Sequence, residues 1–259
     1  MIWLARASLL ALLAMLNSSC CEPPRLCLPI HAASSLVDVL GEFEDHFEAT
    51  HPHIDVLLSF AGSQVLRLQI EEGASAALFF SANSEHMRAL ESSGKIVRSE
   101  VFAHNRLALV VPEDNPAGIE RFEDLVKTNA LSVGTRQVPI GVYARQVIRA
   151  ADRHYGAGFE EKVLSAIASE ETNVRLVRAR VELGQADAGF VYDTDAMSRG
   201  LRRIDIPTEL NVETPCLMGL THTARSDSEI EPIAVAFMNL ALSAKGQSTL
   251  SRHGFERVP

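Results

Sequence analysis

Short apolar runs alternate with amphipathic segments along most of the chain, and this alternation limits the fold more than any other feature. Runs such as LCLPIHA (26–32) and AGFVYDT (188–194) predict strands, whereas SLVDVLGEFEDHFEATHP (35–52) repeats apolar residues at helical spacing. Further strands are expected at 54–60, 76–82, 106–112, 131–135, 201–207 and 214–222, and further helices at 63–73, 84–94, 119–127, 141–156, 174–185 and 230–254. The pattern predicts an α/β fold with mainly parallel sheets and helices on both faces.

The N-terminus has the features of an export signal. Arg6 precedes an apolar stretch, ASLLALLAML (7–16), and the small residues of NSSCC follow it. The stretch is shorter than the roughly 20 residues that a membrane-spanning helix needs. We therefore expect residues 1–20 to be a signal segment of an exported protein. Cys20 or Cys21 is a candidate for lipid attachment, and a plain soluble secreted form is the alternative.

Acidic residues outnumber basic ones, 33 to 24, which gives a formal net charge of -9. Such a chain has no bulk attraction for nucleic acid or for anionic lipid, so neither is an expected partner. An anionic ligand would have to be bound by local dipoles rather than by overall charge.

The four cysteines form no CxxC pattern, which argues against a zinc or thioredoxin-like site. Cys27 and Cys216 are candidates for a disulfide in an oxidising compartment. Two buried thiols are the alternative.

Small or capping residues stand at four points where a predicted helix begins; three of these points follow a predicted strand, and the fourth follows 161–170, whose pattern is mixed. These turns contain Ser34-Ser35, Ala61-Gly62-Ser63, Pro139-Ile140-Gly141 and Thr172-Asn173-Val174. A helix N-terminus exposes unpaired N–H groups and roughly half a positive charge. Four such ends that converge would bind an anion without any Lys or Arg.

Other interpretations of these residues stay open at this point. Ser, Thr and Asn are the preferred N-cap residues, so each turn taken alone is also a simple helix cap. Ser63 as a nucleophile would need a GxSxG elbow or a nearby base, and FAGSQ (60–64) provides neither. His51 and His53 lack a third ligand at metal-binding spacing and are expected to be surface residues.

Five blocks of the chain, in order, resemble the periplasmic molybdate-binding proteins of ABC transporters. The resemblance covers essentially all of residues 30–256, and it is carried by AASSLVDVLGEFEDHFEATHPHIDVLLSFAGSQVLRLQIEEGASAALFFSAN, FAHNRLALVVPEDNP, VGTRQVPIGVYARQVI, ETNVRLVRARVELGQADAGFVYDTDA and GQSTLSRHGF. It implies a two-lobed type II binding protein (a venus-flytrap fold) that closes on a tetrahedral oxyanion, molybdate or tungstate. Lobe 1 would comprise 28–106 with 214–259, and lobe 2 would comprise 107–213.

The resemblance also implies the oxyanion ligands, namely Ser35, Ser63, Ile140, Val174 and Tyr192. The two serines and Tyr192 would donate through their hydroxyls, and the first four residues through their backbone N–H groups. Ile140 stands where the family usually has alanine, so its bulk is expected to narrow the mouth of the pocket or to change selectivity. Ser34 adds a hydroxyl beside Ser35 where alanine is commoner.

The resemblance implies a monomeric protein that hands its oxyanion to the membrane permease of an ABC transporter in the periplasm. No cofactor, no metal cation and no enzymatic activity are expected. The alternative is a sensor or binding protein for another oxyanion, sulfate or phosphate, without a role in transport. Nothing in the sequence ranks molybdate against tungstate.

Overall fold

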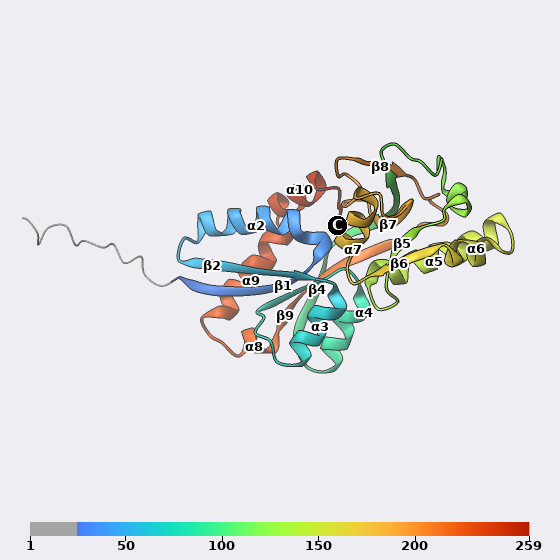
Figure 1. Cartoon of the computed structure of the whole chain (residues 1–259). Helices are drawn as coiled ribbons and strands as arrows, with labels where there is room; N and C mark the ends of the chain where they lie inside the picture. The colour runs from blue at the N-terminus through green and yellow to red at the C-terminus, as the bar shows by residue number, and fades with distance from the viewer. Residues whose placement is uncertain (1–24, 259) are drawn as a thin grey trace, which may run out of the picture.

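The computed structural model describes residues 25–258 and shows a continuous sheet with helices on both faces (Figure 1). The strands follow the order β2-β1-β3-β9-β4-β7-β5-β6, and β8 and β10 also pair with β4. Their bounds are β1 Leu26–Ala33, β2 Ile54–Ala61, β3 Leu78–Ser81, β4 Ile96–Pro112, β5 Leu131–Gly134, β6 Ile167–Glu171, β7 Ala188–Tyr192, β8 Leu201–Ile204, β9 Glu213–Thr221 and β10 Glu256–Arg257. The predicted signal segment, with Cys20 and Cys21, lies outside the described residues.

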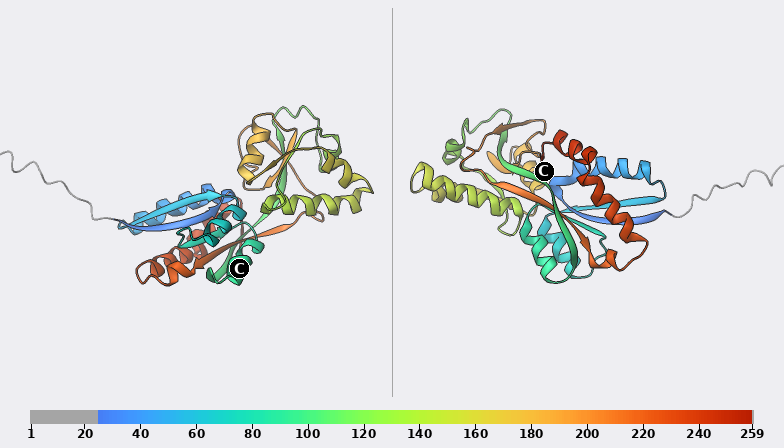
Figure 2. Two further views of the ribbon diagram at one scale, coloured as in Figure 1. Left: turned by 60° about the horizontal axis from the view of Figure 1, so that its bottom comes forward. Right: turned by 180° about the vertical axis from the view of Figure 1, so that it is seen from behind.

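The long strand β4 joins two regions of the sheet. Its residues 96–106 pair with β9, whereas 107–112 pair with β7 and β8. We term β2, β1, β3, β9 and residues 96–106 the first region, and the remaining part of β4 with β7, β8, β5 and β6 the second region. Figure 2 shows them as two bodies joined through β4. The lobe boundaries expected from the sequence stay a prediction, because the strand pairing is continuous across them.

The expectation of mainly parallel sheets is correct for only part of the structure. Strands β1, β2 and β3 pair in parallel, and so do β5, β6 and β7. The strands β4, β8, β9 and β10 pair antiparallel to their neighbours. The reason is that β9 returns from the second region and inserts between β3 and β4.

Helices cover both faces of the first region, as the alternation of side chains along β3 requires. Leu78 and Phe80 belong to the core beneath α2 and α9, where Phe80 contacts Phe237 edge-to-face at 6.1 Å. Phe79 points to the other face and packs with Leu66 of α3 and with α4. Figure 1 shows α2 and α3 on opposite sides of the sheet. The helices in chain order are η1 Ser34–Leu36, α2 Val37–Thr50, α3 Ser63–Glu71, α4 Ser84–Ser92, η2 Phe122–Lys127, α5 Pro139–Tyr155, α6 Phe159–Ser165, α7 Val174–Glu182, α8 His222–Arg225, α9 Ile230–Leu242 and α10 Ala244–Arg252.

In the second region, α5 and α7 pack on the central strands β5 and β7. Gly189 allows α7 to approach β7 closely, since a Cβ there would lie 2.9 Å from a methyl group of Val181. The elements α6, β6, α8 and β10 were not among those expected, and three others differ from the expectation. The strand β4 begins ten residues before 106, at Ile96; 122–127 is a 3-10 helix; and the C-terminal helix is interrupted at Ser243, whose side chain caps α10.

Of the two alternatives for Cys27 and Cys216, the disulfide is wrong, because both cysteines are free, and the alternative of two buried thiols is correct only for Cys216. Cys27 is exposed near the start of β1, and Cys216 is buried near the start of β9, with β3 between these two strands. The registers place them roughly 20 Å apart along the strands. A disulfide needs Cα atoms within about 7 Å of each other. Among residues 25–258, no helix is long and apolar enough to cross a membrane.

Candidate functional site

A small pocket lies where the carboxyl ends of strands from both regions meet. It contains all five residues that the resemblance implies as ligands, and it is lined by Ala33, Ser34, Ser35, Gly62, Ser63, Ala82, Val138, Ile140, Asn173, Val174 and Tyr192. Ser35 follows β1 and Ser63 follows β2 in the first region. Ile140 and Val174 begin helices after β5 and β6 in the second region, and Tyr192 ends β7. The four turns singled out in the sequence therefore do face one another.

The helix N-termini at this pocket mostly lack side-chain caps. The N-cap residues of η1, α3 and α5 are Ala33, Gly62 and Val138, and none of them makes a side-chain cap. Ser63 is the first residue of α3 rather than its cap, so the capping interpretation of this serine is wrong. Only α7 is capped, by Asn173, whose side chain accepts from the N–H of Leu176.

The backbone donors at these ends are free. Within the described part of the chain, the N–H groups of Ser35, Ser63, Ile140 and Val174 have no hydrogen-bond acceptor. Each belongs to the first turn of its helix, where no carbonyl of the same helix can accept from it. Their partial positive charges make this end of the sheet suited to an anion.

The hydroxyl groups of Ser35, Ser63 and Tyr192 add to these donors. Ser63 Oγ accepts from the N–H of Ala82 at 3.1 Å, which leaves its own proton free to donate. The Tyr192 hydroxyl is buried and has no hydrogen-bond partner among residues 25–258. Burial raises the pKa of Tyr192 well above its usual value, so the hydroxyl stays a neutral donor. An unpaired polar group of this kind is costly to bury unless a ligand completes its hydrogen bonding.

Among residues 25–258, no Lys or Arg lines the pocket. Arg175 follows Val174 directly, but its guanidinium is paired with Asp38 and Asp195 and hydrogen-bonded to the Ser34 carbonyl. The pocket is also small, with a volume of about 10 Å³, close to the minimum that holds one water molecule.

Gly62 lets the two walls approach each other, and Gly134 makes room for Ile140 within the second region. A Cβ on Gly62 would lie 2.3 Å from the Thr172 carbonyl oxygen in the other region. A Cβ on Gly134 would lie 2.9 Å from Cγ2 of Ile140 and 2.8 Å from the N of Gly141. The Ile140 side chain is thus accommodated beside a residue without a Cβ at the end of β5. This contact directs at least one methyl group of Ile140 into the second region.

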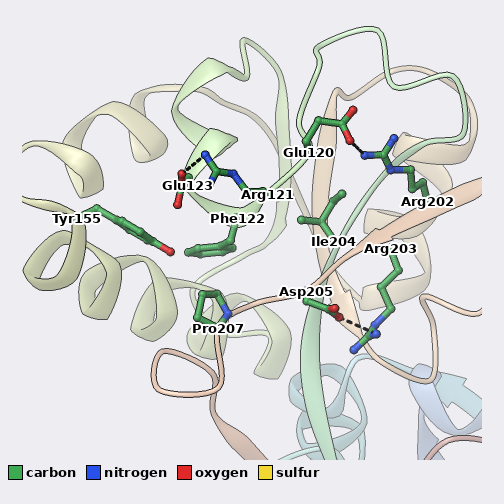
Figure 3. A pocket seen from close by; sticks show the side chains of 10 residues that line it. All are labelled: Glu120, Arg121, Phe122, Glu123, Tyr155, Arg202, Arg203, Ile204, Asp205 and Pro207. Carbon is green, nitrogen blue, oxygen red and sulfur yellow. Dashed lines mark hydrogen bonds and ion pairs between the residues drawn. The ribbon is translucent and has the colours of Figure 1, made fainter.

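A larger pocket, ≈ 400 Å³, lies in the second region and provides a comparison (Figure 3). Its arginines are each paired with carboxylates: Arg202 with Glu120, Arg121 with Glu123, and Arg203 with both Asp193 and Asp205. These ion pairs neutralise the positive charge of the arginines. Among the described residues that line this pocket, one helix N-terminus is present, that of η2, whereas four meet at the smaller pocket. The smaller pocket is therefore the better candidate for an anion.

His51 stacks on Phe47 instead of joining a metal site, and no described group of three His, Cys, Asp or Glu residues is placed to hold a metal.

Residues 28–256 match the model of the family described as bacterial extracellular solute-binding proteins. The chain belongs to this family. Among its solute-binding relatives, YvgL of Bacillus subtilis, provisionally named an ABC transporter substrate-binding lipoprotein, is 28% identical over 92% of this chain and 90% of its own. The molybdate-binding protein ModA of Mycobacterium bovis is 28% identical over 88% of this chain and 84% of its own. The periplasmic molybdate-binding protein of Azotobacter vinelandii has the same fold, with a TM-score of 0.76 at 20% identity over 90% and 99% of the two chains.

Several pocket residues were not among the expected ligands. Asn173 caps α7 from the pocket wall, and Ala33, Ala82 and Val138 close its sides. Ser34 lies beside Ser35 in the wall, so its extra hydroxyl is at the site. Asn173 carried a signal in the sequence, since Asn before a helical run is a typical N-cap. Ala33, Ala82 and Val138 had no such signal in the sequence, because small apolar residues occur throughout the chain.

Proposed function

We propose that this solute-binding protein binds a tetrahedral oxyanion, molybdate or tungstate, in the small pocket and delivers it to the permease of an ABC transporter. One observation carries the proposal: four free backbone N–H groups and the unpaired Tyr192 hydroxyl meet, from both regions, in a pocket without Lys or Arg. The relatives named for molybdate binding support it. The proposed ligands are Ser35, Ser63, Ile140, Val174 and Tyr192.

The chemistry of the donors suits such a dianion. Its four oxygens only accept hydrogen bonds, and the pocket offers N–H and O–H groups that can all donate. A hydrogen bond to a charged group contributes about 1.5–3 kcal/mol net, so several of them outweigh the desolvation of the ion. Since the donors come from both regions, the bound ion favours the arrangement in which the regions are close together.

The same proposal covers export and partners. Residues 1–20 would direct the chain out of the cytoplasm, and Cys20 or Cys21 would carry a lipid anchor if one is present. The protein would act as a monomer that contacts the permease, and it would need no cofactor. Mass spectrometry of the mature protein would identify both the cleavage site and any lipid.

A thermal-shift panel of molybdate, tungstate, sulfate, phosphate and chromate tests the proposed function directly. A ligand that binds only the native state raises its apparent stability, by about 2.7 kcal/mol at a concentration a hundred times Kd. We expect molybdate and tungstate to raise the melting temperature most. A larger shift with sulfate or phosphate would move the function to another oxyanion, and no shift with any of them would contradict oxyanion binding.

Replacing Ser35 or Ser63 with alanine is expected to weaken molybdate binding by about 1–3 kcal/mol each, since each change removes one hydroxyl donor to a charged ligand. Ser63→Ala should also lower the stability of the unliganded protein slightly, because the Ala82 N–H loses its acceptor. Calorimetry measures the affinity, and Ser165→Ala, on the exposed end of α6, is the control. Wild-type affinity in both pocket variants would refute their role as ligands.

A further inference from the structure

Arg175 connects three parts of the pocket wall. Its Nε donates to the Ser34 carbonyl at 3.2 Å and lies 3.2 Å from Asp195 Oδ1, and its Nη2 pairs with Asp38. Ser34 and Asp38 belong to η1 and α2 of the first region, whereas Arg175 and Asp195 belong to the second. A single guanidinium therefore spans the two regions beside the pocket.

On the second region, Arg175 follows one proposed ligand in the chain, and its partner Asp195 contacts another. Val174, its neighbour in α7, presents a free N–H to the pocket. Asp195 is only 1% exposed, and its own N–H donates to the Tyr192 carbonyl at 2.9 Å. The contact between Arg175 and Asp195 thus ties the start of α7 to the turn that follows Tyr192. Arg178 adds a second positive charge near this carboxylate.

On the first region, Arg175 contacts the turn that carries Ser35. The Ser34 carbonyl and the Ser35 N–H belong to the same peptide group, and Asp38 lies in the first turn of α2, which directly follows η1. The positive charge of Arg175 is compensated by two carboxylates and a carbonyl oxygen. The cation is therefore placed to hold the walls together rather than to reach the anion.

We propose that Arg175 is a positioning residue for oxyanion binding, which links Asp38 and the Ser34 carbonyl to Asp195 and so holds the Ser35 turn against Val174 and Tyr192. The inference rests on the proposed function, and it adds residues that do not touch the ligand. A contact made only when the regions are together slows their separation, so its loss should raise the dissociation rate more than it lowers the association rate.

Asp38 offers the cleanest test because its side chain is 60% exposed and its removal leaves the core unchanged. Asp38→Ala should weaken molybdate binding about two- to fivefold, the range expected for an exposed ion pair. Asp38→Glu should recover most of the affinity. Asp45→Ala is the matched control, since it removes one negative charge from an exposed site on the same helix and has no ion-pair partner among the described residues.

Arg175→Gln should weaken binding further, about tenfold or more, because three contacts are lost instead of one. The protein should still fold, since burial raises the pKa of Asp195 to about 7 and loss of the cation leaves this carboxyl free to take up a proton. In a double-mutant cycle, Asp38→Ala should have no further effect on affinity in the Arg175→Gln background.

Stopped-flow kinetics with molybdate and hydrogen exchange without any anion together decide the outcome. We expect faster dissociation in both variants and faster exchange in peptides covering 34–38 and 172–176. The positioning role would be overturned if Asp38→Ala and Asp45→Ala lost the same amount of affinity for molybdate. It would also be overturned if the effects of Asp38→Ala and Arg175→Gln on affinity were additive in the double-mutant cycle. If wild-type protein binds none of the oxyanions, the proposed function fails instead, and the exchange data alone then show whether Asp38 and Arg175 join the two regions.

Discussion

Gly62→Ala is expected to weaken oxyanion binding about a hundredfold or more, a loss of about 2.7 kcal/mol, while the unliganded protein stays folded. The reason is a contact between the two regions. The added Cβ would lie 2.3 Å from the Thr172 carbonyl oxygen, which belongs to backbone and cannot turn away. The regions would have to stay further apart, and donors on opposite walls would then no longer reach one ion.

The fold itself should tolerate this substitution. Gly62 has φ −66° and ψ 142°, an extended conformation that alanine adopts readily. The other close atoms are the end of the Gln64 side chain, which is flexible, although its Nε2 also donates to the Thr172 carbonyl across the regions. The melting temperature without ligand should therefore change by no more than about 2–4 °C.

Calorimetry with molybdate and thermal unfolding without it measure the two quantities separately. Gly41→Ala on α2 is the matched control, because its added Cβ would meet no described atom within 4 Å apart from the neighbouring backbone of its own helix. It should leave affinity unchanged and raise helix stability slightly. Wild-type affinity in Gly62→Ala would show that the two walls need not approach as closely as they do here.

The sequence predicted the elements that form the pocket because their signals are local. Strand-to-helix turns with small residues identified the positions of Ser35, Ser63, Ile140 and Val174, and hydrophobic periodicity placed the helices that begin there. That these turns meet in one pocket followed only from the resemblance to a family. Helical and strand periodicity contain no information on which turns face each other across the sheet.

Two of the misses, the mixed sheet and the unpaired cysteines, depend on long-range pairing, whereas the 3-10 helix at 122–127 and the helix break at Ser243 are local. The strand β9 returns from the second region to pair between β3 and β4, which no local pattern reveals, and this insertion makes the sheet mixed. The same insertion places Cys216 far from Cys27, so the presence of two cysteines did not indicate a disulfide. The contacts of Gly62 with Thr172 and of Arg175 with Asp38 also join segments far apart in sequence.

Tyr192→Phe is expected to change affinity and stability in opposite directions. The Tyr192 hydroxyl is buried without a partner among the described residues, so its removal should raise the free energy of unfolding of the unliganded protein by about 1 kcal/mol or more. If the hydroxyl donates to the oxyanion, the same removal should weaken binding by about 1.5–3 kcal/mol. A purely structural tyrosine would not produce this pair of effects.

Urea unfolding without ligand and calorimetry with molybdate measure the two quantities on the same preparation. Tyr155→Phe is the control, because Tyr155 lies on α5 beside the larger pocket and should affect neither quantity (Figure 3). Because the raised pKa of Tyr192 keeps its hydroxyl protonated, its contribution to binding should not vary between pH 6 and pH 9, roughly the range below a normal tyrosine pKa. Lower stability with unchanged affinity in Tyr192→Phe would mean that the hydroxyl serves the fold. The second region would then contribute only the Ile140 and Val174 amides to ion binding. A gain in stability together with a loss of affinity is expected only if the Tyr192 hydroxyl also binds the ion.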